Sequence, residues 1–232
     1  TASDKNEYAS LLNDYAVGLS EMGHHKQALE AARESVRIYR ELSAGNPAAF
    51  LPNLALSLNN MANRLSNVGQ RKLALEAAQE AVELYRDLCA INPAAFRPAL
   101  AQSLNNLANM LSDVGQHEQA LEAAQEAVKL YRDLCAGNPA SFRQGIAISL
   151  DTLANRLSDV GQHEQALEAA LEAATLFRDL NKTYPDFFCS YLETALHTLL
   201  SCLQAMNRSA EAAAVEAELQ QLQKNTNPKH NT

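Results

Sequence analysis

The chain has 232 residues, of which 47% are hydrophobic, and a formal net charge of -8. The acidic balance disfavours a nucleic-acid partner, because contacts to phosphates require clustered Lys and Arg. No apolar run is long enough to span a bilayer and no signal segment opens the chain, so no membrane partner is expected.

The dominant feature is an internal repeat with a spacing of 46 residues. It is carried by Gly23, Gly69, Gly115 and Gly161, with Asn207 in the fifth place, by Pro47, Pro93, Pro139 and Pro185, and by Phe50, Phe96, Phe142 and Phe188. A fixed period in this range is typical of a repeat architecture. We therefore expect a single array over residues 1–224, with repeats at about 1–46, 47–92, 93–138, 139–184 and 185–224, and a disordered tail over 225–232.

Each repeat contains two amphipathic helical patterns. Leu12, Tyr15, Ala16 and Leu19 recur at helical spacing before Gly23. The same periodicity predicts helices over about 1–23, 25–43, 52–68, 70–90, 98–114, 116–136, 143–160, 162–181, 187–206 and 208–224.

Between repeats, Asn46 precedes Pro47, and a second proline follows at Pro52. Asn followed by Pro fits a helix cap with Pro at the first helical position, but the dipeptide is also a turn signal. The second proline, which recurs as Pro98, favours a helix that starts there after a short turn. We expect the phenylalanines of the repeat to be wedges packed under this turn rather than a binding stripe.

Small and large apolar residues alternate in a specific pattern within each helix pair. The first helices carry Leu58, Met61, Ala62 and Leu65, then Leu104, Leu107, Ala108 and Leu111, then Leu150, Leu153, Ala154 and Leu157; the second helices carry Ala28, Ala74, Ala120, Ala166 and Ala212. Small residues at these places allow two helix backbones to approach closely. In this pattern the chain resembles the tetratricopeptide repeat (TPR) family, in a long form similar to that of kinesin light chain and of bacterial signalling proteins.

The resemblance implies an all-α fold, a right-handed α-solenoid of five helix-turn-helix repeats. Because the commonest TPR has 34 residues, the extra length is expected in a longer second helix and in the Asn-Pro connection. The last repeat departs from the pattern, since Glu216, Gln220 and Gln223 replace apolar residues. A polar face suits a terminal cap, which leaves the N-terminal face as the expected place for weak end-to-end self-association.

By the resemblance, first helices line a concave groove, and its polar positions are the candidate binding site. Asn predominates although it is a mediocre helix former. An amide offers donors and an acceptor, which suits an extended peptide backbone; the alternative is that these amides bond to the backbone or to one another. The candidates are Asn13, Asn59, Asn60, Asn63, Ser66, Asn67, Gln102, Asn105, Asn106, Asn109, Ser112, Asp113, Asp151, Asn155, Ser158 and Asp159.

Charge in the groove bears on the partner. A groove that grips an acidic tail needs Lys and Arg, whereas Arg64 and Arg156 lie only beside the candidate row. Asp113, Asp151 and Asp159 favour a neutral or basic protein or peptide instead. The alternative is that these three carboxylates are only solvated.

Chemistry other than binding has little support in the sequence. His25, His117 and His163 recur after the glycine turns, but one His per repeat does not supply the ligands of a metal site. No phosphate-binding loop, catalytic set or cofactor motif is present, and four cysteines without a CxxC pair favour reduced thiols in the cytoplasm. The sequence therefore predicts a non-catalytic protein- or peptide-binding scaffold, or alternatively the sensor or regulatory arm of a larger multi-domain signalling protein, linked to an ATPase or an effector.

Overall fold

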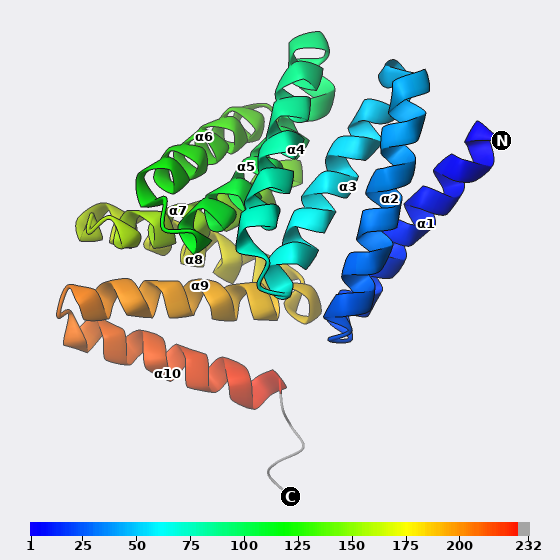
Figure 1. Ribbon diagram of the computed structural model, residues 1–232. Helices are drawn as coiled ribbons and strands as arrows, with labels where there is room; N and C mark the ends of the chain where they lie inside the picture. The colour runs from blue at the N-terminus through cyan, green and yellow to red at the C-terminus, as the bar shows by residue number, and fades with distance from the viewer. Residues whose placement is uncertain (227–232) are drawn as a thin grey trace, which may run out of the picture. The chain divides into compact units, whose positions relative to one another are not determined.

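The fold is all-α, as the sequence predicts. The computed structural model describes residues 1–226, in which ten helices follow one another without a strand (Figure 1). They are α1 Ala2–Glu21, α2 His25–Gly45, α3 Pro47–Asn67, α4 Arg71–Ile91, α5 Pro93–Asp113, α6 His117–Gly137, α7 Pro139–Asp159, α8 His163–Thr183, α9 Pro185–Ala205 and α10 Ser209–Thr226. Of the expected tail, residues 227–232 lie outside the described part.

The chain divides into two compact units, Thr1–Ala123 and Ala124–Thr232, with α6 crossing the boundary. In unit 1, each of α1 to α4 packs on the helix that follows it, and among the first helices α3 also contacts α1 and α5. In unit 2, α7 packs on α8, α8 on α9 and α9 on α10, and α7 also contacts α9. Each unit is thus a stack of helical hairpins in which the first helices form one layer.

The two helices of a hairpin are joined by a glycine turn. Gly69 has a φ of +76°, in the left-handed region that glycine adopts without strain. Its N–H bonds to the carbonyl of Ser66 at 2.8 Å, and the N–H of Gln70 bonds to the carbonyl of Leu65 at 2.9 Å. This is the Schellman arrangement, which satisfies the last carbonyls of a helix. In the fifth hairpin, Asn207 takes the same place with a φ of 56°.

Successive hairpins are joined more tightly than the sequence suggests. Asn46 is the only residue between α2 and α3, and its side chain accepts a hydrogen bond from the N–H of Ala49 at 3.3 Å. Asn46 therefore caps α3, with Pro47 at the first helical position. The expected turn before Pro52 does not exist, so the prediction that the first helix starts at Pro52 was wrong. The same side-chain cap recurs at Asn92 and Asn138.

The early start of the first helices changes the position of the prolines and phenylalanines. Pro52 lies inside α3, where it removes one backbone donor and the helix nevertheless continues. Phe50 occupies the first turn of α3 and packs, half-buried, against the core of unit 1. The phenylalanines are packed as predicted, but within a helix rather than under a turn. With both helices of this repeat 21 residues long, the extra length of the repeat lies in both helices.

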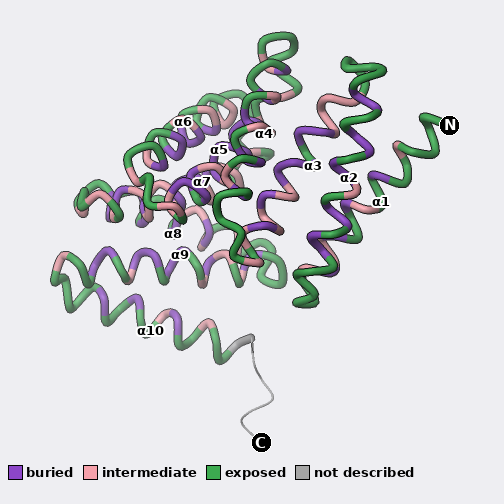
Figure 2. Tube along the Cα trace, viewed as in Figure 1, coloured by how far each residue is buried: buried purple, intermediate pink, exposed green. Residues whose placement is uncertain are grey.

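The core consists of small and branched side chains at the positions that the repeat pattern marks. Ala28, Ala74, Ala120 and Ala166 have no exposed surface, and their counterpart Ala212 is 6% exposed. Figure 2 shows buried positions recurring along the helices of each unit on the sides that pack. Since the contact residues are alanines, the helix axes can approach closely, which explains the regular stacking of helix pairs.

One face of unit 1 departs from this pattern. Tyr8, Leu11 and Tyr15 on α1 are 54%, 59% and 60% exposed. Their counterparts one repeat later are Leu54, which is 5% exposed, Ser57, which is fully buried, and Met61, which is half-buried. The buried pattern of the later repeats requires a preceding helix pair. Tyr15, predicted to belong to the buried stripe of its helix, is therefore exposed.

Candidate functional site

The predicted site residues of unit 1 lie on the layer of first helices. In this layer α1 contacts α3 and α3 contacts α5, so polar residues at equivalent positions follow one another from helix to helix. We call the exposed and half-buried members on α3 and α5 the first-helix surface. It comprises Asn60, Asn63, Ser66, Asn67, Gln102, Asn106, Asn109, Ser112 and Asp113.

Three of the predicted residues lie beneath this surface. Asn13, Asn59 and Asn105 are only 6%, 4% and 5% exposed. Together with position 151 they occupy equivalent places in four successive repeats, which we call the ladder position. Their burial means that a ligand lying on the surface would not reach them directly.

The buried asparagines connect successive first helices. Asn13 donates from Nδ2 to the hydroxyl oxygen of Ser57 at 2.7 Å. Asn59 accepts on Oδ1 from Nδ2 of Asn106 at 3.1 Å and from the hydroxyl of Ser103 at 3.4 Å. Each bond crosses from one repeat to the next, so the ladder sets the register of the stack. For these asparagines the structure thus shows hydrogen bonds within the chain, which is the alternative to ligand binding that the sequence left open.

The serines that complete the ladder were missed by the sequence reading. Ser57, Ser103 and Ser149 are fully buried and lie 46 residues apart. Ser35 is also fully buried and donates to the carbonyl of Ala9 at 2.8 Å. A polar residue at a fixed place on an otherwise apolar stripe was the available signal, because buried hydroxyls require a partner.

Two further hydrogen bonds join successive first helices at the edge of the first-helix surface. Nδ2 of Asn67 donates to the hydroxyl oxygen of Ser20 at 3.0 Å, and the hydroxyl of Ser66 donates to Oδ2 of Asp113 at 3.1 Å. These side chains are exposed or half-buried. They can exchange these bonds for bonds to a ligand at little cost, since net bond energies in water are small.

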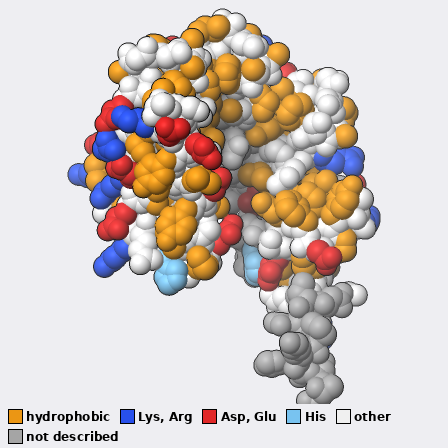
Figure 3. Space-filling model, turned by 90° about the vertical axis from the view of Figure 1, so that its right-hand side faces the viewer, with side chains coloured by type: hydrophobic (Ala, Val, Ile, Leu, Met, Phe, Trp, Pro, Cys, Tyr) orange, Lys and Arg blue, Asp and Glu red, His pale blue; other side chains and the backbone are white. Residues whose placement is uncertain are grey.

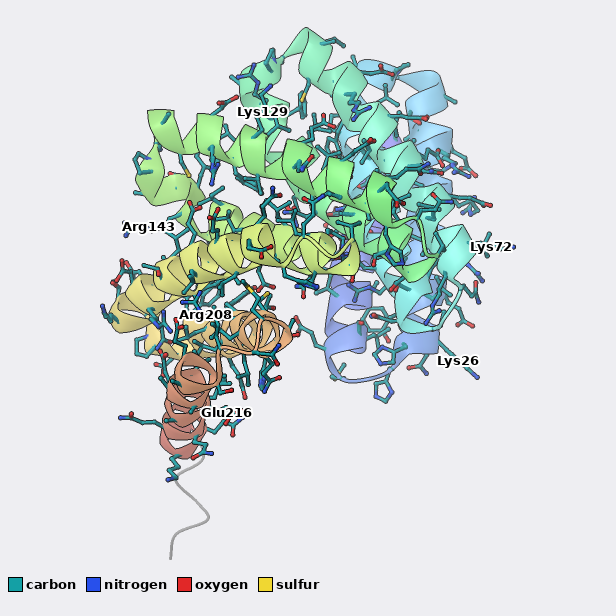
Figure 4. The ribbon with its side chains drawn as sticks, turned by 90° about the vertical axis from the view of Figure 1, so that its left-hand side faces the viewer. Lys26, Lys72, Lys129, Arg143, Arg208 and Glu216 are labelled. Carbon is teal, nitrogen blue, oxygen red and sulfur yellow. The ribbon has the colours of Figure 1, made fainter. Side chains whose placement is uncertain are left out.

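Arg64 links α3 to α1 and does not extend its charge over the first-helix surface. Its Nη1 donates to the carbonyl of Ala16 on α1 at 3.3 Å. Burial lowers the pKa of its guanidinium, an effect that Glu21 opposes. Lys26 and Lys72, at the starts of α2 and α4, point away from their helices into solvent (Figure 4). The polar residues that remain on the first-helix surface are amides, hydroxyls and a carboxylate.

In unit 2 the corresponding residues are Asp151, Asn155, Ser158 and Asp159, all on α7. Asn155 donates from Nδ2 to the carbonyl of Asp151 at 2.9 Å, and Oδ2 of Asp159 pairs with Nε of Arg156 at 2.9 Å. Ser158 lies 3.7 Å from the sulfur of Cys202. Burial raises the pKa of the Asp151 carboxyl, while a hydrogen bond from Thr198 and the charge of Arg156 act in the opposite direction.

The second helices carry two shallow hollows of about 280 and 220 Å³, one in each unit. Each is flanked by an ion pair between successive repeats: Arg40 with Glu80 at 2.6 Å and Arg132 with Glu172 at 2.9 Å. These side chains are about half exposed, so the pairs contribute little to stability. Because equivalent hollows occur between second helices in both units, we attribute them to repeat packing.

Within the described residues, 1–226, the side chains that could bind a metal ion do not form a metal centre. No group of three or more His, Cys, Asp or Glu side chains gathers around a point where an ion would fit. Burial raises the pKa of all four cysteine thiols, Cys89, Cys135, Cys189 and Cys202. None of the ten helices combines the length and the apolar character that crossing a membrane requires.

Family models match three segments of the chain. A model described as tetratricopeptide repeat matches residues 54–92 and 100–139. A model described as anaphase-promoting complex subunit 5 matches residues 1–51. No curated protein sequence matches the chain.

Solved structures with a similar fold include three repeat proteins. A putative kinesin light chain from Podosopora anserina with nearly identical TPR-like repeats has a TM-score of 0.69 at 19% identity, over 97% of this chain and 98% of that one. BtubC (BKLC) from P. vanneervenii also has a TM-score of 0.69, at 15% identity over 100% and 94%. A Rap protein complexed with competence and sporulation factor has a TM-score of 0.72, at 15% identity over 93% of this chain and 54% of that one. At these identities the likeness concerns the fold alone.

Proposed function

From the premise that the repeats of this chain are tetratricopeptide repeats similar to those of kinesin light chain, we propose that it is a non-catalytic scaffold that binds an extended protein segment. The binding site is the first-helix surface of unit 1. The Rap protein of similar fold is seen with a bound factor, which supports a binding role for this architecture. The buried ladder holds the first helices in register, and the amides above it are exposed or half-buried.

The observation that carries the proposal is the repetition of exposed amides above the ladder. Asn67 on α3 and Gln102 and Asn109 on α5 are exposed, and Asn63 and Asn106 are half-buried. An amide can both donate to and accept from a peptide backbone, whatever the side chains of the peptide. Equivalent residues on adjacent helices offer such contacts in series along an extended chain.

The partner we propose is neutral to basic. Asp113 adds a carboxylate to the first-helix surface, the chain carries a net charge of -8, and the one arginine beside the surface, Arg64, is engaged with a backbone carbonyl. A basic segment is attracted to such a surface and an acidic one is repelled, with an effect that falls as salt rises.

The proposal is tested by capture of partners from a native lysate with wild type and with the variant Asn63→Ala, Asn67→Ala, Gln102→Ala and Asn109→Ala. The matched control is Gln27→Ala with Gln79→Ala, exposed amides on the second helices α2 and α4. We expect the first variant to lose partners that wild type and the control retain, with all three melting at similar temperatures. Identical partners for all three proteins would overturn the proposal.

A second candidate is the regulatory arm of a larger protein. The observation that favours it is that this chain aligns with only 54% of the Rap protein of similar fold. In that case a ligand on the first helices would control another domain. Sequencing the complete reading frame and measuring any attached activity with and without captured partners tests this candidate.

The exposed face of α1 supports weak end-to-end self-association. Figure 3 shows hydrophobic side chains on the side of the molecule that carries α1. At the other end, Glu216, Gln220 and Gln223 of α10 are exposed and polar, so association should use the α1 faces of two copies. Sedimentation of wild type and of Tyr8→Lys with Tyr15→Lys should show a concentration-dependent species in wild type alone.

A further inference from the structure

Unit 2 contains a cavity on its first-helix side. It has a volume of about 280 Å³ and lies between α7 and α9, with one side chain of α8 in its wall. Since a liquid water molecule occupies about 30 Å³, the cavity can hold a long amino-acid side chain. Its lining includes Ile148, Asp151, Phe177, Ser190, Tyr191 and Thr194.

Asp151 occupies the ladder position, where the three preceding repeats have asparagine. Asn13 donates its amide hydrogen to the next repeat, at 2.7 Å from Ser57. An ionised Asp has no hydrogen to donate, and Oδ1 of Asp151 is buried without a hydrogen-bond partner. The amide is thus replaced by a partly buried carboxylate, and Asp151 lines the cavity.

The described residues provide no cation that neutralises Asp151 at contact distance. Arg156 is near enough to affect its charge, but the Nε of Arg156 pairs with Asp159 at 2.9 Å. Thr198 gives the Asp151 carboxyl a hydrogen bond, but a largely buried anion without a cation in contact is unfavourable, and burial raises the pKa of this carboxyl. A cation that enters the cavity would relieve this cost.

The other wall of the cavity is aromatic. The rings of Phe177 and Tyr191 stack with their centroids 5.7 Å apart and an angle of 17° between their planes. The Tyr191 ring also stacks with that of Phe187 at 6.1 Å. Phe177 and Tyr191 line the cavity, so these rings give the aliphatic part of a long side chain an apolar surface to pack against.

The equivalent place in unit 1 is built differently. There Tyr39 replaces Phe177 and Asn53 replaces Tyr191, and the Tyr39 hydroxyl donates to the carbonyl of Asn6 at 3.3 Å. Nδ2 of Asn53 donates to the Tyr39 hydroxyl at 3.3 Å and to Oδ1 of Asn6 at 3.2 Å. Unit 1 closes this place with its own hydrogen bonds, whereas unit 2 presents a carboxylate and aromatic rings.

We propose that this cavity binds the side chain of a lysine or arginine from the partner segment, with the Asp151 carboxylate pairing with the cation and the Tyr191 ring flanking it. The assignment of the cation to a protein segment rests on the proposed function; the cation specificity rests on the cavity alone. It gives unit 2 an anchoring position that selects side-chain charge, in addition to the surface of unit 1 that contacts backbone.

The test uses the whole chain and capped amino acids as probes. N-acetyl-lysine amide and N-acetyl-arginine amide are titrated against it and followed by the backbone NMR signals of Ser190, Tyr191 and Thr194. N-acetyl-norleucine amide is the neutral control of similar length. We expect saturable shifts with the two cations and at least tenfold weaker binding of norleucine. Equal affinity for the charged and neutral probes would overturn the proposal.

Two variants assign the effect to the cavity. Asp151→Asn installs the residue that three other repeats carry at this place, so the fold should persist while cation binding weakens at least tenfold. Thr194→Lys places a tethered cation at the rim and should block the probes even if Asp151→Asn alters the packing. Cation binding that survives both changes would show that the cavity is not the site.

The outcome is separable from that of the proposed function. The variant with four alanines on the first-helix surface of unit 1 should bind the capped amino acids as wild type does. If the probes bind and that variant still captures every partner, the proposed surface is wrong and the cavity stands. If the probes fail to bind while the alanine variant loses its partners, the cavity proposal fails and the proposed function stands.

Discussion

The ladder position can be compared between the two units. In unit 1, Asn59 is 4% exposed and accepts two hydrogen bonds from the next repeat. In unit 2, Asp151 is less deeply buried, with one oxygen unpartnered and its carboxyl pKa raised by burial. Here a carboxylate replaces the amide, and Ala195 stands where the preceding repeats place Ser57, Ser103 and Ser149. A hydrogen-bonded contact between repeats is thereby replaced by a carboxyl with one unpartnered oxygen. Some of the following substitutions exchange amide and carboxylate at the ladder position. The others change glycines in the helices and turns around it.

The largest loss of stability is expected from Asn59→Asp. This change places a carboxylate at the ladder position in unit 1, as Asp151 does in unit 2. Asn59 is 4% exposed, so water would hydrate the new charge poorly, and an uncompensated buried charge costs about 3 kcal/mol. The free energy of unfolding, measured by urea denaturation at pH 7, should fall by that amount and recover partly as the pH falls and the carboxyl protonates.

The control for this change is Asn67→Asp. Asn67 is exposed, and its counterparts Asp113 and Asp159 already carry the carboxylate. We expect its stability to stay within about 0.5 kcal/mol of wild type, as is usual for exposed positions. An equal loss in both variants would mean that burial of the ladder is not the cause.

The next effect concerns Gly145 on α7, where unit 2 packs a tyrosine. A Cβ atom built at Gly145 would lie 2.2 Å from Cε1 of Tyr131, whereas unit 1 carries Ala99 at the equivalent place. Gly145→Ala must displace a buried ring, and such overpacking costs about 2 kcal/mol. The loss is read from the urea midpoint of the variant.

Gly18→Ala separates this steric effect from the helix propensity of alanine. Gly18 lies within α1 and has open space around the site of a new Cβ, so the change should stabilise the protein slightly. If Gly145→Ala is also stabilising, the close approach of Tyr131 does not constrain unit 2.

The helix pairs were predictable because their causes are local and periodic. Gly69 requires a left-handed turn, and apolar residues at helical spacing mark the buried faces, so the all-α fold and the pairing of helices follow from the sequence. The connection at Asn46 was misjudged because both Asn-Pro and Pro52 are turn signals. The sequence does not show that tertiary packing carries α3 through Pro52.

The candidate site was only partly predictable, since burial depends on the neighbouring repeat. Asn59 and Asn63 lie on one helix and share a residue type, yet one is buried and the other half-buried. Whether an amide faces the next repeat or solvent depends on how closely α3 and α5 approach. The cavity beside Asp151 depends in addition on the stacking of Phe177 with Tyr191. This contact joins two helices and cannot be predicted from the repeat period.

A smaller loss of stability is expected from a change in the glycine turn, which joins the two helices of a hairpin in both units. Gly69→Ala places a Cβ atom in the left-handed region at a φ of +76°, which costs about 1 kcal/mol. Gly45→Ala is the matched control, because Gly45 lies in α2 with open space around it and a φ outside that region. We expect a lower melting temperature for the first variant only. Equal behaviour of the two would indicate that the turn relaxes to accept a side chain.

The smallest effect is expected from Asp151→Asn, which restores the amide of unit 1 in unit 2. It should raise the free energy of unfolding by less than about 1 kcal/mol, the net contribution of one hydrogen bond. The sign of the pH dependence follows from the raised pKa of the folded carboxyl. Between its unfolded and folded pKa values the folded state binds more protons, so this group makes wild type less stable as the pH rises.

The variant should therefore gain on wild type as the pH rises through this window and keep a constant advantage above it. Thr198 on α9 and Arg156 on α7 also act on this carboxyl and lower its pKa, which limits the width of the window. Glu164→Gln, at an exposed carboxylate on the neighbouring helix α8, should not reproduce the profile. If Asp151→Asn lost stability at neutral pH, the carboxylate would have a favourable partner in the folded chain, and a cation entering the cavity would have no unpaired charge to meet.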